Sequence, residues 1–117
     1  ISIPSQKIVN EDWQKHGKKI DAGKAAIVTD QKGIPAILDF NNGKSAFLIH
    51  ASAPIAGTNK HDPLLINALK SAYRGILDEA HQLQQLNPAK SLIIACAPLG
   101  IGIYGNDPKV SAKAAFD

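Results

Sequence analysis

The clearest pattern in the chain is an apolar stripe that repeats at helical spacing between Asp62 and Asn87. Asp62 can cap free backbone amides, and the following Pro63 suits the first turn of a helix. The spacing places the apolar side chains on one face. They are Leu64, Leu65, Ala68, Leu69, Ala72, Tyr73, Ile76, Leu77, Ala80 and Leu83. The stripe predicts a helix of about five or six turns that lies against a sheet and ends at Asn87 and Pro88.

Four shorter apolar runs have the length of β-strands and are bounded by turn residues. They cover residues 25–29, 36–40, 45–51 and 91–97. Turns are predicted at 30–35 and at 41–44, where Asn and Gly tolerate positive φ. The run at 45–51 is mostly apolar, so we expect a central strand that is covered on both faces. We expect the run at 91–97 to be another buried strand, with Cys96 as a small buried hydrophobic residue.

Two further helices are predicted at the ends of the chain. Residues 8–20 carry apolar side chains at a spacing that suits a short helix ending near Gly17. Asp107 and Pro108 repeat the start signal of the long helix. An α/β layered fold typically has this succession of elements: a buried strand, a long helix, a second buried strand, a glycine loop and a helix. We expect one domain over residues 1–117.

The composition is that of a globular chain, with 44% apolar and 20% charged residues among 117. No apolar run approaches the roughly 20 residues that cross a bilayer, so no membrane association is expected. The single cysteine excludes an internal disulfide or a cysteine-rich zinc site. His16, His61 and His81 lack metal-ligand spacing, and His50 is expected to be a core or strand-end residue. We expect a cytoplasmic protein and, because the chain does not begin with Met, a processed chain or a piece of a larger one.

The charge pattern is mildly basic. The formal net charge is +3, and Lys15, Lys18, Lys19 and Lys24 gather near the N-terminus. Such a patch can meet phosphate groups. Aromatic residues, on which single-stranded nucleic acids stack, make up only 5% of the chain. A solvated basic face is therefore favoured over a nucleic-acid interface.

The candidate chemistry lies in residues 98–105, which read Pro-Leu-Gly-Ile-Gly-Ile-Tyr-Gly. Glycine lets the backbone approach a ligand closely, and successive amides can form a nest for an anion such as a diphosphate. The spacing also satisfies Gly-x-Gly-x-x-Gly, but the dinucleotide fingerprint belongs to the first strand-to-helix turn and needs a later acidic residue. That interpretation is disfavoured this close to the C-terminus. A simple tight turn remains the alternative.

The turn at residues 102–105, Gly-Ile-Tyr-Gly after an apolar run, resembles the second phosphate loop of macrodomains. Further segments resemble the same family in the same order along the chain. They are residues 23–25, 27–29, 48–54 and 69–73. The resemblance therefore covers about residues 23–116.

Membership of that family implies a three-layer α/β/α fold with a mixed sheet, here incomplete at both ends. It implies binding of ADP-ribose or of ADP-ribosylated protein, with no other cofactor. The ligand-binding residues that it implies are Leu99, Gly100, Ile101, Gly102, Ile103 and Tyr104. In this expectation the amides of residues 100–104 surround the diphosphate, and Tyr104 lies against the distal ribose.

The chain also departs from the family pattern. Nothing before Gly23 matches the family's acidic adenine-binding residue or its Asn- and Gly-rich segment, and its final strand would lie beyond Asp117. The residues that position and activate water belong to the segment not found, so the resemblance implies a reader or a hydrolase without deciding between them. The alternative is a macrodomain-like interaction or structural module without nucleotide binding. Either another part of the protein or a second chain supplies the missing segments, or ADP-ribose binding is degraded.

Overall fold

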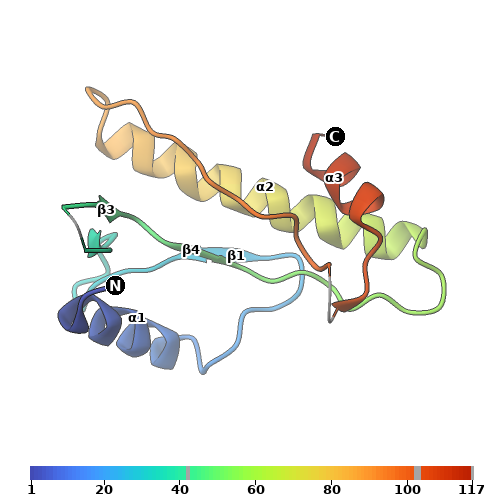
Figure 1. Cartoon of the computed structure of the whole chain (residues 1–117), viewed down its shortest axis with the longest axis horizontal. Helices are drawn as coiled ribbons and strands as arrows, with labels where there is room; N and C mark the ends of the chain where they lie inside the picture. Colours follow the sequence, from blue (N-terminus) through green and yellow to red (C-terminus); the bar gives the residue numbers. More distant parts are fainter. Residues whose placement is uncertain (42, 102–103, 117) are drawn as a thin grey trace.

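The computed structural model describes residues 1–41, 43–101 and 104–116, in which one helix is followed by four short strands and then by two helices (Figure 1). The elements are α1 (Ile3–Lys15), β1 (Ala25–Ile27), β2 (Leu38–Asp39), β3 (Ser45–Ala46), β4 (Ile49–Ala51), α2 (Pro63–Leu86) and α3 (Pro108–Phe116). This part of the chain forms a mixed α/β arrangement of three helices and two small antiparallel sheets. In Figure 1, α2 lies on one side of the β1–β4 ribbon and α1 on the other.

Helix α2 confirms the predicted start at Asp62 and Pro63. The Asp62 side chain accepts a hydrogen bond from the Leu64 amide at 2.9 Å, which satisfies one free amide of the first turn. The buried face consists of Leu65, Leu69, Ala72, Tyr73, Ile76, Ala80 and Leu83. Leu64 and Leu77 remain exposed. The buried stripe is therefore narrower than the apolar pattern indicates.

Strands β1 and β4 pair antiparallel and pack under α2. The register places Ala25 opposite Ala51 and Ile27 opposite Ile49. Gly75 of α2 allows the close approach, because a Cβ there would lie 3.0 Å from the Cβ of Ala25. The main core lies between these elements and α3, and its buried members are Ala53, Leu69, Tyr73, Ile76 and Ala114.

A hairpin formed by β2 and β3 packs against Val28, the residue that follows β1. Its turn has Asn41 at φ 70° and Gly43 at φ 74°, so the predicted turn is confirmed at its described residues. Leu38 of β2 is fully buried, in a second core cluster with Val28 and Ala36. Residues Ile8 and Val9 of α1 pack against this cluster. The hairpin and α1 therefore share an apolar core separate from that under α2.

The prediction of one central strand at residues 45–51 is wrong. The run is divided into β3 and β4, which belong to different two-stranded sheets. In the described part of the chain β4 pairs with β1 alone. An apolar run signals burial, but strand pairing depends on partners that are distant in sequence.

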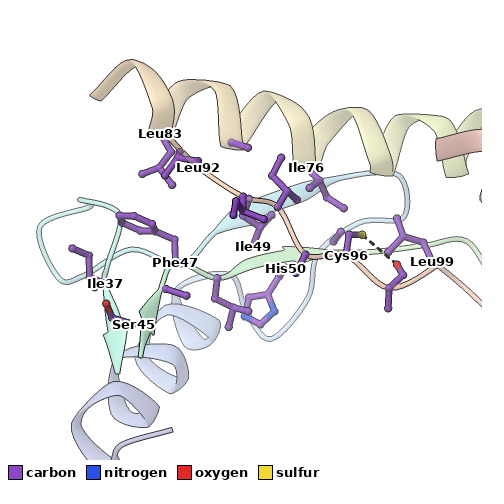
Figure 2. Close-up of a pocket in the computed structure, with 18 of the residues that line it drawn as sticks. Ile37, Ser45, Phe47, Ile49, His50, Ile76, Leu83, Leu92, Cys96 and Leu99 are labelled. Carbon is purple, nitrogen blue, oxygen red and sulfur yellow. Dashed lines mark hydrogen bonds between the residues drawn. The ribbon is translucent and has the colours of Figure 1, made fainter. Parts of the chain in front are cut away.

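The predicted buried strand at residues 91–97 is also not formed. This segment has no regular secondary structure, and it makes no backbone–backbone hydrogen bond within the described chain. Ile93 is 96% exposed, and Cys96 is exposed and not buried as predicted. Figure 2 shows the segment passing between α2 and β4, with Leu92 near Leu83. The sequence is suited to a strand, but no neighbouring strand lies against it in the described residues.

The two terminal helices agree in part with the pattern. Helix α1 begins at Ile3, before the predicted start at residue 8, because the Ser2 side chain caps the Ser5 amide. It ends near Gly17 as predicted, where φ is 65°. Helix α3 begins at Pro108 as predicted. Among the described helices, none is long and apolar enough to cross a membrane.

Candidate functional site

Three hydrogen bonds hold the start of the glycine loop against the two C-terminal helices. The Leu99 amide donates to the Tyr73 hydroxyl at 2.8 Å, and the Ser111 hydroxyl donates to the Leu99 carbonyl at 2.6 Å. The Tyr73 and Ser111 oxygens are 2.8 Å apart. Because the single hydroxyl hydrogen of Ser111 is already used, Tyr73 is the donor to Ser111. The three residues thus form a closed cycle in which every donor has an acceptor.

Gly100 occupies a position that only glycine suits. Its φ is +72°, and an added Cβ would lie 2.5 Å from Nδ2 of Asn106 and 2.9 Å from the Cβ of Ala53. Asn106 is 3% exposed. Its Nδ2 donates to the carbonyls of Pro54 at 2.8 Å and Gly100 at 2.9 Å. Asn106 therefore ties the loop to the segment that follows β4, a role that the sequence pattern did not indicate.

A pocket of about 630 Å³ opens beside this loop, and we call it the loop pocket. It is lined by Trp13, Lys18, Lys19, Ile20, His50, Ala51, Ser52, Ala53, Leu99, Gly100, Ile101 and Tyr104. Four of the six residues expected to bind a ligand, Leu99, Gly100, Ile101 and Tyr104, are thus brought together. The other two, Gly102 and Ile103, lie outside the described residues.

Another part of the loop pocket's wall comes from α1 and β4. The rings of Trp13 and His50 are 5.3 Å apart and inclined at 48°, a tilted aromatic contact. Alternation along the strand directs His50 away from α2, as Figure 2 shows. Its Nε2 atom is buried and has no hydrogen-bond partner within the described chain. A buried unpaired nitrogen is costly, and a ligand hydroxyl could satisfy it.

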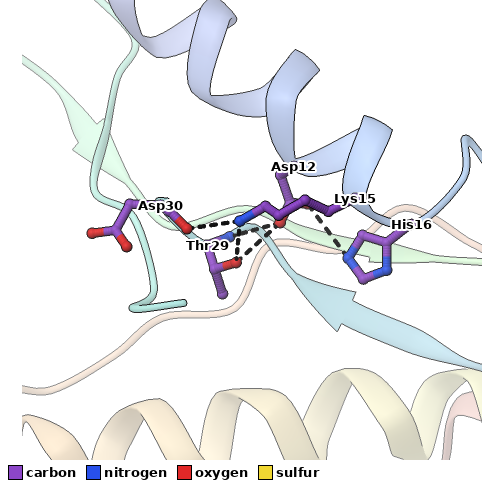
Figure 3. Close-up of polar contacts among 5 residues, drawn as sticks. All are labelled: Asp12, Lys15, His16, Thr29 and Asp30. Carbon is purple, nitrogen blue, oxygen red and sulfur yellow. Dashed lines mark hydrogen bonds and ion pairs between the residues drawn. The ribbon is translucent and has the colours of Figure 1, made fainter. Parts of the chain in front are cut away.

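Asp12 fixes α1 in the position that places Trp13 in this wall (Figure 3). One carboxylate oxygen, Oδ1, accepts from the amide and the hydroxyl of Thr29, both at 3.1 Å. Lys15 adds a hydrogen bond to the Asp30 carbonyl at 2.7 Å. The Asp12 side chain is 1% exposed, and Nε2 of His16 lies 3.6 Å from its other oxygen. These contacts connect α1 to the end of β1, so Trp13 and the following turn have a defined place.

Positive charge at the loop pocket comes from that turn after α1. Lys18 and Lys19 both line the pocket, and no carboxylate occurs among its described lining residues. Lys19 lies 3.9 Å from Asp21, but both side chains are largely exposed, so this pair is weak. The two ammonium groups therefore give the pocket a positive potential that suits an anion.

Two backbone amides at the start of the loop have no acceptor among the described residues. The Leu99 amide is occupied by Tyr73. The amides of Gly100 and Ile101 donate to no other described residue. The donors for an anion therefore begin at Gly100, and Leu99 contributes its side chain to the lining. Within the described residues, no group of three His, Cys, Asp or Glu side chains is arranged to hold a metal.

Comparisons of the chain with protein-family models, with curated proteins and with solved structures found no match. The pocket is lined by the glycine loop, by two lysines and by the rings of Trp13 and His50, a combination suited to a phosphorylated ligand with a ring system.

Proposed function

We propose that the chain is a macrodomain-like module that binds ADP-ribose in the loop pocket. The observation that carries the proposal is the opening of a glycine loop into a pocket lined by Lys18 and Lys19. The amides of Gly100 and Ile101 are unoccupied by other described residues. Backbone amides in a glycine loop together with ammonium groups are a common way to hold a diphosphate.

The remaining pocket walls suit the sugar and base of such a ligand. Trp13 and Ile20 provide apolar surface, and the buried Nε2 of His50 can exchange a hydrogen bond with a ribose hydroxyl. Tyr104, which is 40% exposed at the rim, is proposed to lie against the distal ribose. A volume of about 630 Å³ lies within the range of about 300–1,000 Å³ found for small-molecule sites.

The proposed fold is the three-layer α/β/α macrodomain arrangement, incomplete within residues 1–117. The placement of α1 and α2 on opposite sides of the β1–β4 ribbon is compatible with it (Figure 1). The extended segment 91–97 would be a further strand of the same sheet once a neighbouring strand is present. Sheets of this class are covered by helices on both faces, which agrees with the apolar character of that segment.

We propose that the module binds ADP-ribosylated protein as a reader, and we propose no catalytic reaction. Hydrolysis needs a residue that activates or positions water, and no carboxylate lines the loop pocket among the described residues. The second candidate function is an interaction module without nucleotide binding. The exposed apolar segment 91–97 favours this second candidate, because exposed apolar patches mark interaction sites.

Calorimetric titration with ADP-ribose, with AMP as a control ligand, tests the proposal. We expect a dissociation constant in the micromolar range, about −8 kcal/mol, and weaker binding of AMP because it has one phosphate. The double variant Lys18→Glu/Lys19→Glu should bind ADP-ribose at least about tenfold more weakly. The matched control Lys32→Glu/Lys44→Glu makes the same change of net charge away from the pocket. Absence of binding at millimolar ADP-ribose, or equal binding of AMP, would contradict the proposal.

A further inference from the structure

Lys18 has a backbone conformation that its residue type does not favour. Its φ is 57°, in the left-handed region, where the Cβ comes close to the following carbonyl oxygen. Among the described residues, Asn41 is the other non-glycine residue with positive φ. Asn41 lies in a hairpin turn and tolerates this conformation, whereas a lysine rarely adopts it. The residue type therefore accounts for the backbone of Asn41 but not for that of Lys18.

The end of α1 does not require a left-handed residue at position 18. The Gly17 amide donates to the Gln14 carbonyl at 3.0 Å, and the Lys18 amide donates to the Trp13 carbonyl at 2.9 Å. These bonds form a Schellman cap, whose left-handed residue is normally the glycine. Gly17 meets that need with φ 65°. A second left-handed residue directly after it changes the direction of the chain and contributes no further hydrogen bond to the cap.

This change of direction occurs where the chain enters the wall of the loop pocket. Lys18, Lys19 and Ile20 line the pocket together with Trp13, which belongs to the last turn of α1. In Figure 1 the same segment connects α1 with β1. The strained residue is therefore itself a lining residue of the candidate site. Backbone strain that persists at a binding site points to a functional role for the residue that carries it.

Of the two lysines in the pocket wall, Lys18 has the less compensated charge. Lys19 lies 3.9 Å from Asp21, and its side chain is 79% exposed. Within the described residues, the Lys18 ammonium group makes no hydrogen bond and no ion pair. An anion in the loop pocket therefore meets an uncompensated charge at Lys18 and a partly compensated one at Lys19.

We propose that Lys18 is the main phosphate-binding cation of the loop pocket, and that its left-handed backbone conformation serves to hold the ammonium group there. The inference rests on the proposed function, because it concerns a ligand with a phosphate or diphosphate group. It assigns the recognition of that charge to one residue. Stability and affinity should therefore change in opposite directions when Lys18 is replaced by glycine.

Two substitutions separate the backbone strain from the charge. Lys18→Ala removes the ammonium group and keeps a Cβ, whereas Lys18→Gly removes both the charge and the steric conflict. We expect Lys18→Gly to have a higher urea midpoint than the parent and than Lys18→Ala, because glycine adopts positive φ freely. Asn41→Gly is the matched control. Its midpoint should change less, since asparagine already tolerates the conformation.

Titrations with ADP-ribose and with inorganic pyrophosphate measure the contribution of the charge. Lys18→Gly and Lys18→Ala should bind both ligands at least about fivefold more weakly than the parent, whereas Lys19→Ala should lose about twofold or less. Lys18→Arg keeps the charge and should recover most of the affinity. Added salt should weaken binding by the parent more than binding by Lys18→Ala, because salt screens the charge that the variant lacks. A change in the fold alone would not alter this salt dependence.

The outcomes separate this inference from the proposed function. A parent chain that binds neither ligand would contradict both, and one that binds pyrophosphate alone would contradict the proposed function while the loss at Lys18 is still measured. Binding that Lys19→Ala weakens more than Lys18→Ala would overturn the role of Lys18 alone. Equal urea midpoints of Lys18→Gly and Lys18→Ala would overturn the claim of strain. A more stable Lys18→Gly variant that binds like the parent would overturn the link between strain and binding.

Discussion

The hydroxyl oxygen of Tyr73 in α2 lies 2.8 Å from that of Ser111 in α3. With the amide and carbonyl of Leu99, these hydroxyls close a hydrogen-bonded cycle at the point where segment 91–97 enters the glycine loop. Tyr73 is 9% exposed and Ser111 is fully buried. The packing of α3 on α2 and the position of the loop are therefore coupled through one phenol group.

Tyr73→Phe tests this coupling. Loss of the hydroxyl leaves the Leu99 amide without an acceptor and Ser111 without a donor, so we expect a loss of about 1–3 kcal/mol in the free energy of unfolding. Urea denaturation followed by circular dichroism gives the value. Tyr104→Phe, which removes a hydroxyl from a 40% exposed side chain, is the matched control. Equal stabilities of the two variants would show that the cycle contributes nothing measurable.

Gly100→Ala tests the shape of the loop. The positive φ alone costs roughly 1–3 kcal/mol for a residue with a side chain, and the new Cβ would press on Asn106 and Ala53. We expect lower stability and a loss of ADP-ribose affinity. The control is Gly57→Ala, where a Cβ meets no atom within 4 Å. A fully stable Gly100→Ala variant that binds like the parent would contradict the described loop geometry.

The sequence predicts correctly those elements whose signals act between residues close together in the chain. The starts of α2 and α3 were predicted because an Asp cap and a following Pro act within one turn. The turn at 41–44 is local in the same way. The predicted strand at residues 91–97 is wrong because an apolar pattern indicates burial alone. A strand also needs a hydrogen-bonding partner elsewhere in the chain.

The same distinction applies to the candidate site. The glycine spacing predicts a ligand site at residues 99–104, and the described residues of this range line the loop pocket. Trp13 and His50 were not predicted to share its wall, because their contact depends on the docking of α1. Asn106 was missed because a single Asn before a helix has no distinctive spacing. Such tertiary contacts cannot be read from a local pattern.

Asp12→Ala should release α1 from β1. The amide and hydroxyl of Thr29 lose a buried acceptor, so we expect about 1–3 kcal/mol of destabilisation. Trp13 is the only tryptophan, and its fluorescence should shift to longer wavelength as its contact with His50 is lost. Asp78→Ala on the exposed face of α2 serves as the control. Unchanged fluorescence and stability in Asp12→Ala would contradict this anchoring role.

The exposure of Cys96 predicts rapid reaction with a thiol reagent. In the folded chain the rate should lie within about tenfold of the rate in urea, because little structure covers the sulfur. A folded-state rate lower by several orders of magnitude would show that the segment is buried after all.

The most direct measurement of the central claim is an NMR titration of the ¹⁵N-labelled chain with ADP-ribose, because it reports both whether the ligand binds and where. The account predicts saturable shifts at the amides of Gly100 and Ile101, at Lys18 and Lys19, and at the indole N–H of Trp13, with little change along the exposed face of α2. No shifts at millimolar ligand, or shifts confined to residues remote from the loop pocket, would contradict the claim that this chain binds ADP-ribose at its glycine loop.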